Sequence, residues 1–113
     1  MTTNNHEVIF AIVNSGYAED VMEVAKANGA RGGTILTGRG VAKEDTAALF
    51  GITIQPEKEI LMMVVEKEIK NAILNAIYTE MGLEKPAHGI AFSLPVTDTA
   101  GLFQSASKES AEE

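Results

Sequence analysis

The fold is decided by a glycine-rich stretch, GARGGTILTGRG (residues 29–40), and by the connection VAKEDTAALFGITIQP (residues 41–56) that follows it. Between the glycines lies the mostly β-branched run TILT, which predicts a strand from Thr34 to about Arg39. Most hairpin loops contain about 2–5 residues, and longer loops in small domains usually serve a function. We therefore expect the rest of the chain to be a scaffold that carries this loop.

Three further strands are predicted from apolar runs at Val8–Val13, Glu59–Val65 and Gly89–Val96. The first two runs are continuous, as in strands that are buried on both faces. In the last run, alternate residues form one apolar face, namely Ile90, Phe92, Leu94 and Val96. Pro95 cannot donate to a strand ladder, so this strand should lie at an edge or end near the proline.

Two helices are predicted between these strands. The first follows Ser15, a suitable N-cap residue, and ends at Gly29, a suitable residue just beyond a helix. The second begins at Glu66, where Glu66 and Lys70 have the spacing of an i,i+4 pair, and is closed by Gly82. Its expected buried stripe consists of Ile69, Ile73, Ala76 and Ile77, with Leu74, Tyr78 and Met81 beside it.

The resulting order, strand-helix-strand-strand-helix-strand, predicts a ferredoxin-like α+β fold. Such a fold has an antiparallel four-stranded sheet with both helices on one face. The strands at Val8–Val13 and Glu59–Val65 are apolar on both faces, so the second sheet face should also be covered. Self-association is the simplest way to cover it.

Length and composition indicate one domain, which we place at residues 1–98, followed by a polar tail at residues 99–113. The net charge of −7 disfavours binding to nucleic acid or to anionic membranes. The chain has no cysteine, its N-terminus does not resemble a signal peptide, and its longest apolar run, Ile60–Val65, is too short to span a bilayer. We therefore expect a cytoplasmic protein.

Catalytic and metal-binding patterns are weak. His6 and His88 are far apart in sequence and do not have metal-ligand spacing, and no paired general acid and base is evident. We therefore expect a protein without enzymatic activity. His88 precedes a strand and is either a ligand contact or a solvated loop residue.

The glycine-rich stretch is the better candidate for a binding site. Its glycines let the backbone approach a ligand closely, and Arg31 and Arg39 flank the predicted strand with side chains suited to a phosphate. Lys58 could serve the ligand from the opposite side. The alternative is that these are turn glycines with two surface arginines.

The connection at residues 41–55 is expected to bind another protein. It carries a polar part with Lys43 and Glu44 and an apolar end with Leu49 and Phe50. The alternative is an ordinary compact surface loop.

The order of elements resembles that of the PII signal-transduction family, the trimeric nitrogen-regulatory proteins. The resemblance spans about residues 7–97 and rests on GARGGTILTGRG, the long loop after it, PEKEILMMVV and HGIAFSLPV. It implies a homotrimer whose inter-subunit clefts bind ATP or ADP, often with Mg²⁺ and 2-oxoglutarate. It also implies that residues 41–55 act as a protruding T-loop that docks on a transporter, an enzyme or a transcription regulator.

The same resemblance implies a set of nucleotide-binding residues. Thr34 matches the threonine near the adenine, and Gly38, Arg39 and Gly40 match the start of the T-loop. His88 and Gly89 match part of the glycine-rich loop before the last strand.

The chain departs from the family pattern at several positions. It has Ile90 in place of a phosphate-binding lysine and Thr97, Asp98 and Thr99 where arginines are expected, and residues 41–55 contain no tyrosine. Two alternatives therefore stay open. One is a ligand-independent interaction module, and the other is a sensor of a different small anion or of a cyclic nucleotide.

Overall fold

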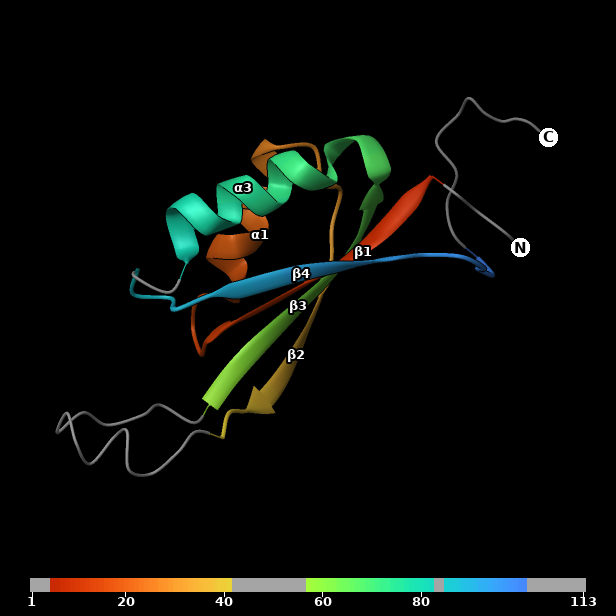
Figure 1. Cartoon of the computed structure of the whole chain (residues 1–113). Coiled ribbons are helices and arrows are strands. Elements are labelled where there is room, and N and C mark those ends of the chain that lie inside the picture. The colour runs from red at the N-terminus through yellow and green to blue at the C-terminus, as the bar shows by residue number, and fades with distance from the viewer. Residues whose placement is uncertain (1–4, 42–56, 83–84, 102–113) are drawn as a thin grey trace, which may run out of the picture.

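The computed structural model describes residues 5–41, 57–82 and 85–101. The elements are β1 (His6–Asn14), α1 (Ala18–Ala27), β2 (Thr34–Arg39), β3 (Glu57–Glu66), the 3₁₀ turn η1 (Lys67–Ile69), α3 (Lys70–Met81) and β4 (Ile90–Pro95). The strands form one four-stranded sheet in the order β2-β3-β1-β4, and all its pairs are antiparallel. Both helices cover the same sheet face (Figure 1). The predicted ferredoxin-like fold is confirmed.

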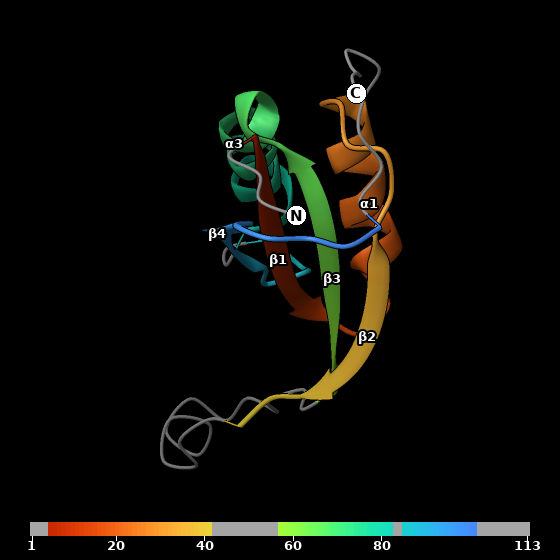
Figure 2. The same cartoon turned by 90° about the vertical axis from the view of Figure 1, so that its right-hand side faces the viewer.

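The hydrophobic core lies between the helices and one face of the twisted sheet (Figure 2). Alternate residues of the two central strands point to the helices and are fully or almost fully buried, namely Ile9, Ala11, Val13, Leu61, Met63 and Val65. The helices contribute Val21 and Ala25 from α1 and Ile73 and Ile77 from α3. This alternation follows from the two-residue period of side chains along a strand.

The other sheet face, which we call the open face, is also apolar. The register places its residues in rows, with Leu36, Ile60, Ile12 and Ile90 in one row and Thr34, Met62, Phe10 and Phe92 in the next. Phe10 and Phe92 stack with ring centroids 5.4 Å apart. In the single chain Ile90, Phe92 and Leu94 are about half exposed, at 47%, 45% and 51%. The expected apolar second face is confirmed.

The first helix begins differently from the prediction. Its N-cap is Tyr17 and no side chain of the neighbouring turn caps it, so the prediction of Ser15 as N-cap is wrong. The backbone N–H of Ala18 donates instead to Glu59 Oε1 at 3.0 Å, across from β3. A carboxylate at this place also suits the positive end of the helix. The start of β3 is thereby joined to the start of α1.

The end of the first helix agrees with the prediction. Gly29 follows the C-cap Asn28 and has φ of +107°, a conformation that glycine adopts without steric cost. The N–H of Gly29 donates to Lys26 O and that of Ala30 to Ala25 O, which is the Schellman arrangement. This turn directs the chain from α1 into the glycine-rich segment that precedes β2.

The second helix starts later than predicted. Glu66 is the last residue of β3, and its Oε2 lies 3.8 Å from Arg31 Nη2, so the predicted pair with Lys70 is not formed. Tyr78 was expected beside the buried stripe, but it is 78% exposed because the stripe narrows to Ile73 and Ile77. Gly82 is the C-cap residue, as predicted. Neither described helix is long and apolar enough to cross a bilayer.

Candidate functional site

Most of the predicted binding residues gather at one end of the sheet, on the left in Figure 1. Gly38, Arg39 and Gly40 lie at the end of β2, and Lys58 lies at the start of β3, where it pairs with Gly38 in register. His88 and Gly89 directly precede β4 at the same end. We call this group of residues, together with Asn14, the sheet-end cluster.

Two of the predicted residues lie elsewhere. Thr34 is at the far end of β2, opposite Met62. Arg31 precedes that strand and lies beside Glu66, at the opposite end of β3 from Lys58. A single chain therefore does not bring Arg31 or Thr34 to the sheet-end cluster, and their role in binding stays a prediction.

Asn14 joins the parts of the sheet-end cluster. It is the last residue of β1 and is directly opposite Lys58, whose Nζ donates to Asn14 Oδ1 at 2.7 Å. Asn14 Nδ2 donates to Pro86 O at 3.2 Å, and its backbone N–H donates to Ala87 O at 2.9 Å. The connection that carries His88 is thus attached to the end of β1. Sequence reasoning missed Asn14 because its partners are far away along the chain.

Gly38 has no side chain and therefore leaves the β2 side of Lys58 open. Gly38 lies on the open face beside Lys58, and a Cβ atom at Gly38 would come within 3.1 Å of Ile60 Cδ1. Arg39 alternates to the other face and is opposite Glu57 in register. Positively charged side chains therefore project from both faces of the sheet at this end.

The turn before β4 uses its backbone donors internally. The N–H of His88 donates to Lys85 O at 2.9 Å, and the N–H of Gly89 donates to Met81 O at 2.7 Å. His88 has φ of +50°, a left-handed conformation that is uncommon for residues other than glycine. These two N–H groups are engaged within the chain, and the side chain of His88 is exposed.

Gly89 is required for packing. A Cβ atom there would overlap with Met81 O and lie 3.0 Å from Val13 Cγ1. We expect Gly89→Ala to lower the free energy of unfolding by about 1–3 kcal/mol, because backbone and core atoms must move to admit the methyl group. Gly32→Ala is the control, since a Cβ atom at Gly32 meets no atom within 4 Å. Urea denaturation of both variants measures the difference, and equal stabilities would contradict this role of Gly89.

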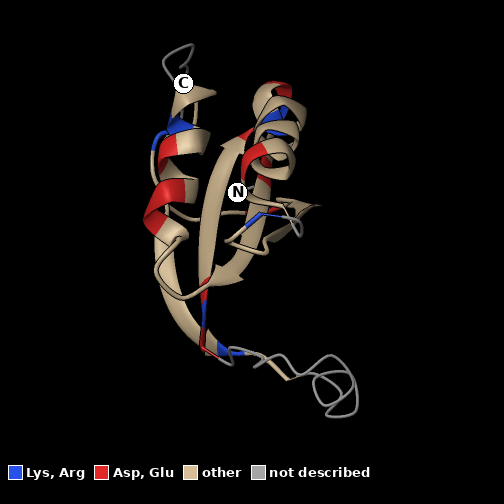
Figure 3. Ribbon diagram, turned by 90° about the vertical axis from the view of Figure 1, so that its left-hand side faces the viewer, with Lys and Arg blue, Asp and Glu red and all other residues tan. Residues whose placement is uncertain are grey.

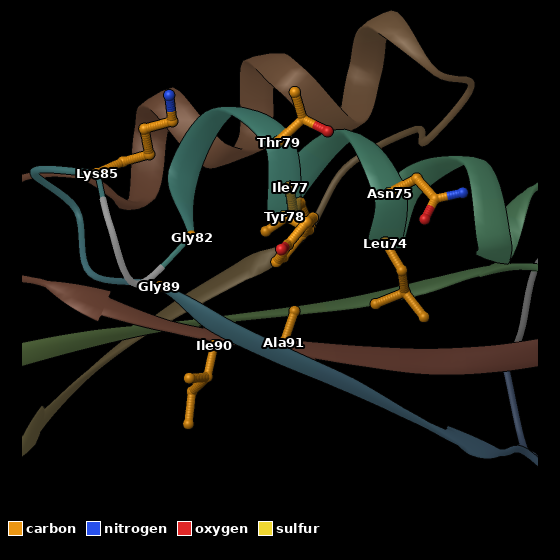
Figure 4. A pocket seen from close by; sticks show the side chains of 10 residues that line it. All are labelled: Leu74, Asn75, Ile77, Tyr78, Thr79, Gly82, Lys85, Gly89, Ile90 and Ala91. Atoms are coloured by element: carbon orange, nitrogen blue, oxygen red, sulfur yellow. The ribbon is translucent and has the colours of Figure 1, made fainter.

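A groove of about 790 Å³ lies between α3 and the edge strand β4 (Figure 4). Its lining includes Leu74, Tyr78, Lys85 and Ala91, and it shares only Gly89 with the predicted binding residues. In Figure 4, Ala91 points toward α3 and Ile90 points to the opposite sheet face. The groove therefore meets the sheet-end cluster only at Gly89, in the turn before β4.

The charges are unevenly distributed. The exposed side of α1 carries Glu19, Asp20 and Glu23 and is largely acidic (Figure 3). Arg39 and Lys58 lie together with Glu57 and Glu59 at the sheet end. Within the described residues, no group of three or more His, Cys, Asp or Glu side chains could hold a metal ion. Binding of Mg²⁺ stays a prediction.

The predicted docking residues Lys43, Glu44, Leu49 and Phe50 lie outside the described residues, as does most of the predicted tail. The described chain reaches Val41, which is 93% exposed, and resumes at Glu57. Because Arg39 and Glu57 are opposite each other in the β2–β3 pair, the two attachment points of the connection lie side by side.

The model of the family nitrogen regulatory protein P-II matches residues 6–103, which is most of the chain. The chain belongs to the P-II family. No curated protein sequence matches it significantly.

Solved P-II structures share the fold. The chain is similar to the Arabidopsis thaliana PII bound to citrate, with 24% identity, a TM-score of 0.62 and coverage of 85% of this chain and 79% of that one. A putative PII-like signalling protein of Thermus thermophilus has 20% identity, a TM-score of 0.65 and coverage of 87% and 93%. The PII-like protein CPII of Thiomonas intermedia, bound to ADP, AMP and bicarbonate, has 13% identity, a TM-score of 0.61 and coverage of 86% and 96%.

Proposed function

We propose that this P-II family protein is a signal-transduction regulator that binds ATP or ADP in clefts between the subunits of a homotrimer. Family membership supports the signalling role, and the gathering of Gly38–Gly40, Lys58 and His88 at one sheet end carries the assignment of the site. The connection at residues 41–55 starts at this site, so a bound nucleotide would contact the first residues of the connection. We propose that the connection transmits the nucleotide state to a partner protein such as a transporter or a metabolic enzyme.

The open face supports the proposed trimer. Ile90, Phe92 and Leu94 on this face are about half exposed in the single chain. Large contiguous apolar patches are rare on the surfaces of monomeric proteins. Packing copies of the chain through this face would bury these side chains. It would also bring the sheet ends of neighbouring copies near one another, as inter-subunit clefts require.

The type of ligand is supported by the charges at the sheet end. Arg39 and Lys58 are cations beside flexible glycine backbone, and such groups bind phosphates in many proteins. The related CPII structure contains ADP and AMP. Because the N–H groups of His88 and Gly89 are used within the chain, the side chains of the cluster would provide most of the phosphate contacts.

Calorimetry with ATP, ADP, AMP and cyclic nucleotides tests this proposal. Binding of ATP or ADP with a dissociation constant below the millimolar range is the expected result. Absence of binding by every nucleotide would remove the nucleotide-sensing function. It would favour the second candidate, a ligand-independent interaction module, which the internal use of the His88 and Gly89 donors also favours.

Arg39 is expected to contribute directly to this binding. Arg39→Ala should weaken ATP binding at least about tenfold, because hydrogen bonds to charged groups contribute roughly 1.5–3 kcal/mol. Lys26→Ala is the matched control, since Lys26 is an exposed cation of α1. Its Nζ lies 4.0 Å from Glu23 Oε2. Unchanged ATP affinity of Arg39→Ala, measured by calorimetry, would exclude Arg39 from the site.

A further inference from the structure

We propose that Asn14 is a positioning residue of the nucleotide site. Asn14 holds Lys58 and the turn before β4 in a fixed relation, and the Lys58 ammonium then binds a phosphate of the nucleotide. This inference rests on the proposed function. It adds a residue that the sequence motifs do not indicate, and it assigns the phosphate rather than the nucleoside to Lys58.

Asn14 contacts both of its neighbours through specific atoms. Lys58 Nζ can only donate a hydrogen bond and Pro86 O can only accept one. The side-chain amide of Asn14 must therefore turn its Oδ1 to Lys58, at 2.7 Å, and its Nδ2 to Pro86, at 3.2 Å. Because both atoms of the amide are used, neither an acceptor alone nor a donor alone would replace it. Together with the backbone bond to Ala87, this residue connects β1, β3 and the turn before β4.

Lys58 keeps binding capacity in this arrangement. An ammonium group has three donors, and the bond to Asn14 uses one of them. Among the described residues, no carboxylate forms an ion pair with Lys58. Its sequence neighbour Glu59 points to the helix face, where it accepts the N–H of Ala18. The positive charge of Lys58 is therefore available to an anion at the end of the open face.

The row across the sheet shows where that anion would lie. Gly38, Lys58 and Asn14 are consecutive members of one row, and the next row consists of Leu36, Ile60, Ile12 and Ile90. Lys58 is thus a cation at the border of an apolar surface, with glycine on one side and Asn14 on the other. A phosphate held in a cleft between subunits would match such a border.

Asn14 also orders Lys58 before the ligand arrives. A lysine side chain loses considerable rotamer freedom when it is fixed in one geometry. The bond to Asn14 moves that ordering cost from binding to folding, which strengthens binding through preorganisation. A purely structural strand-end asparagine would stabilise the turn before β4 without changing how strongly Lys58 holds a phosphate.

Comparing ATP with adenosine separates these two roles. By calorimetry, Asn14→Ala should weaken ATP binding about tenfold, as loss of a charge-assisted contact would. Adenosine, which lacks phosphate, should bind within about twofold of wild type because no lysine contact is involved. Asn28→Ala is the matched control, since Asn28 Nδ2 donates to Val24 O at 2.9 Å in α1, away from the site. Equal loss of ATP and adenosine affinity would overturn the proposal.

A double-mutant cycle tests whether Asn14 acts through Lys58. In the Lys58→Met background, Asn14→Ala should cause little further loss of ATP affinity, whereas independent roles would give additive losses. Asn14→Asp is a second variant of nearly the same shape, in which a carboxylate would neutralise Lys58 and also weaken ATP binding. ATP affinity unchanged in Asn14→Asp would contradict the proposal. If the wild-type protein binds neither ATP nor ADP, the proposed function falls with it; if wild type binds and the cycle is additive, only the role of Asn14 falls.

Discussion

Phe92→Asp is expected to convert the assembled protein into monomers. Phe92 lies on the open face, stacks on Phe10 at 5.4 Å and is 45% exposed in the single chain. In the proposed trimer this side chain would be buried between subunits. A carboxylate there would be removed from water without a partner, which costs several kcal/mol per copy. Each of the three copies in a trimer adds this cost, so the equilibrium should shift strongly toward the monomer.

Size-exclusion chromatography with light scattering measures this result at matched protein concentrations. Ala72→Asp is the control, because Ala72 lies on the exposed side of α3 and receives the same charge change. The control should keep the mass of the wild type. A Phe92→Asp protein with the wild-type trimer mass would show that the open face is not the interface, and a monomeric wild type would remove the trimer altogether.

Ile73→Ala is expected to cause the largest loss of fold stability. Ile73 is fully buried in α3 and belongs to the same core cluster as Ile9 and Leu61. Removing its Cγ1, Cγ2 and Cδ1 atoms loses apolar burial and leaves a cavity between α3 and the sheet. Substitutions of this kind lower the free energy of unfolding by about 2–5 kcal/mol. For a small domain this is a large share of a total that is typically about 5–15 kcal/mol.

Urea denaturation followed by circular dichroism measures the change. Asn75→Ala on the exposed side of the same helix is the control and should stay within about 0.5 kcal/mol of wild type. Both variants are compared at one protein concentration, because assembly adds to the apparent stability. A loss below about 1 kcal/mol for Ile73→Ala would mean that α3 does not close the core as described.

The regular elements could be predicted from sequence because their signals are local. The strand Thr34–Arg39 is bounded by glycines, and Gly29 and Gly82 end their helices as predicted. The continuous apolar runs Val8–Val13 and Glu59–Val65 also predicted an apolar second sheet face, on which Ile90, Phe92 and Leu94 are about half exposed. Local patterns of this kind depend only on neighbouring residues.

The predictions that were wrong or incomplete have a common physical cause. Ser15 has the right chemistry for an N-cap, but Glu59 performs part of that role from another strand. Tyr78 has helical spacing relative to the buried residues, but the fold leaves it 78% exposed beside the groove between α3 and β4. Asn14 was missed for the same reason, because its partners Lys58 and Pro86 come from distant parts of the sequence. Contacts set by tertiary packing cannot be read from a local pattern.

The side-by-side attachment of the connection to β2 and β3 has a consequence for how such proteins diversify. Both attachment points belong to one strand pair, in which Arg39 is opposite Glu57. Closing a loop on such an anchor depends weakly on its length, at about 0.6 kcal/mol for each doubling. Insertions, deletions or exchange of the segment between these anchors would therefore leave the sheet and the proposed ligand site largely intact. If the proposed function holds, the choice of partner could change by replacement of this one segment while the rest of the domain stays the same.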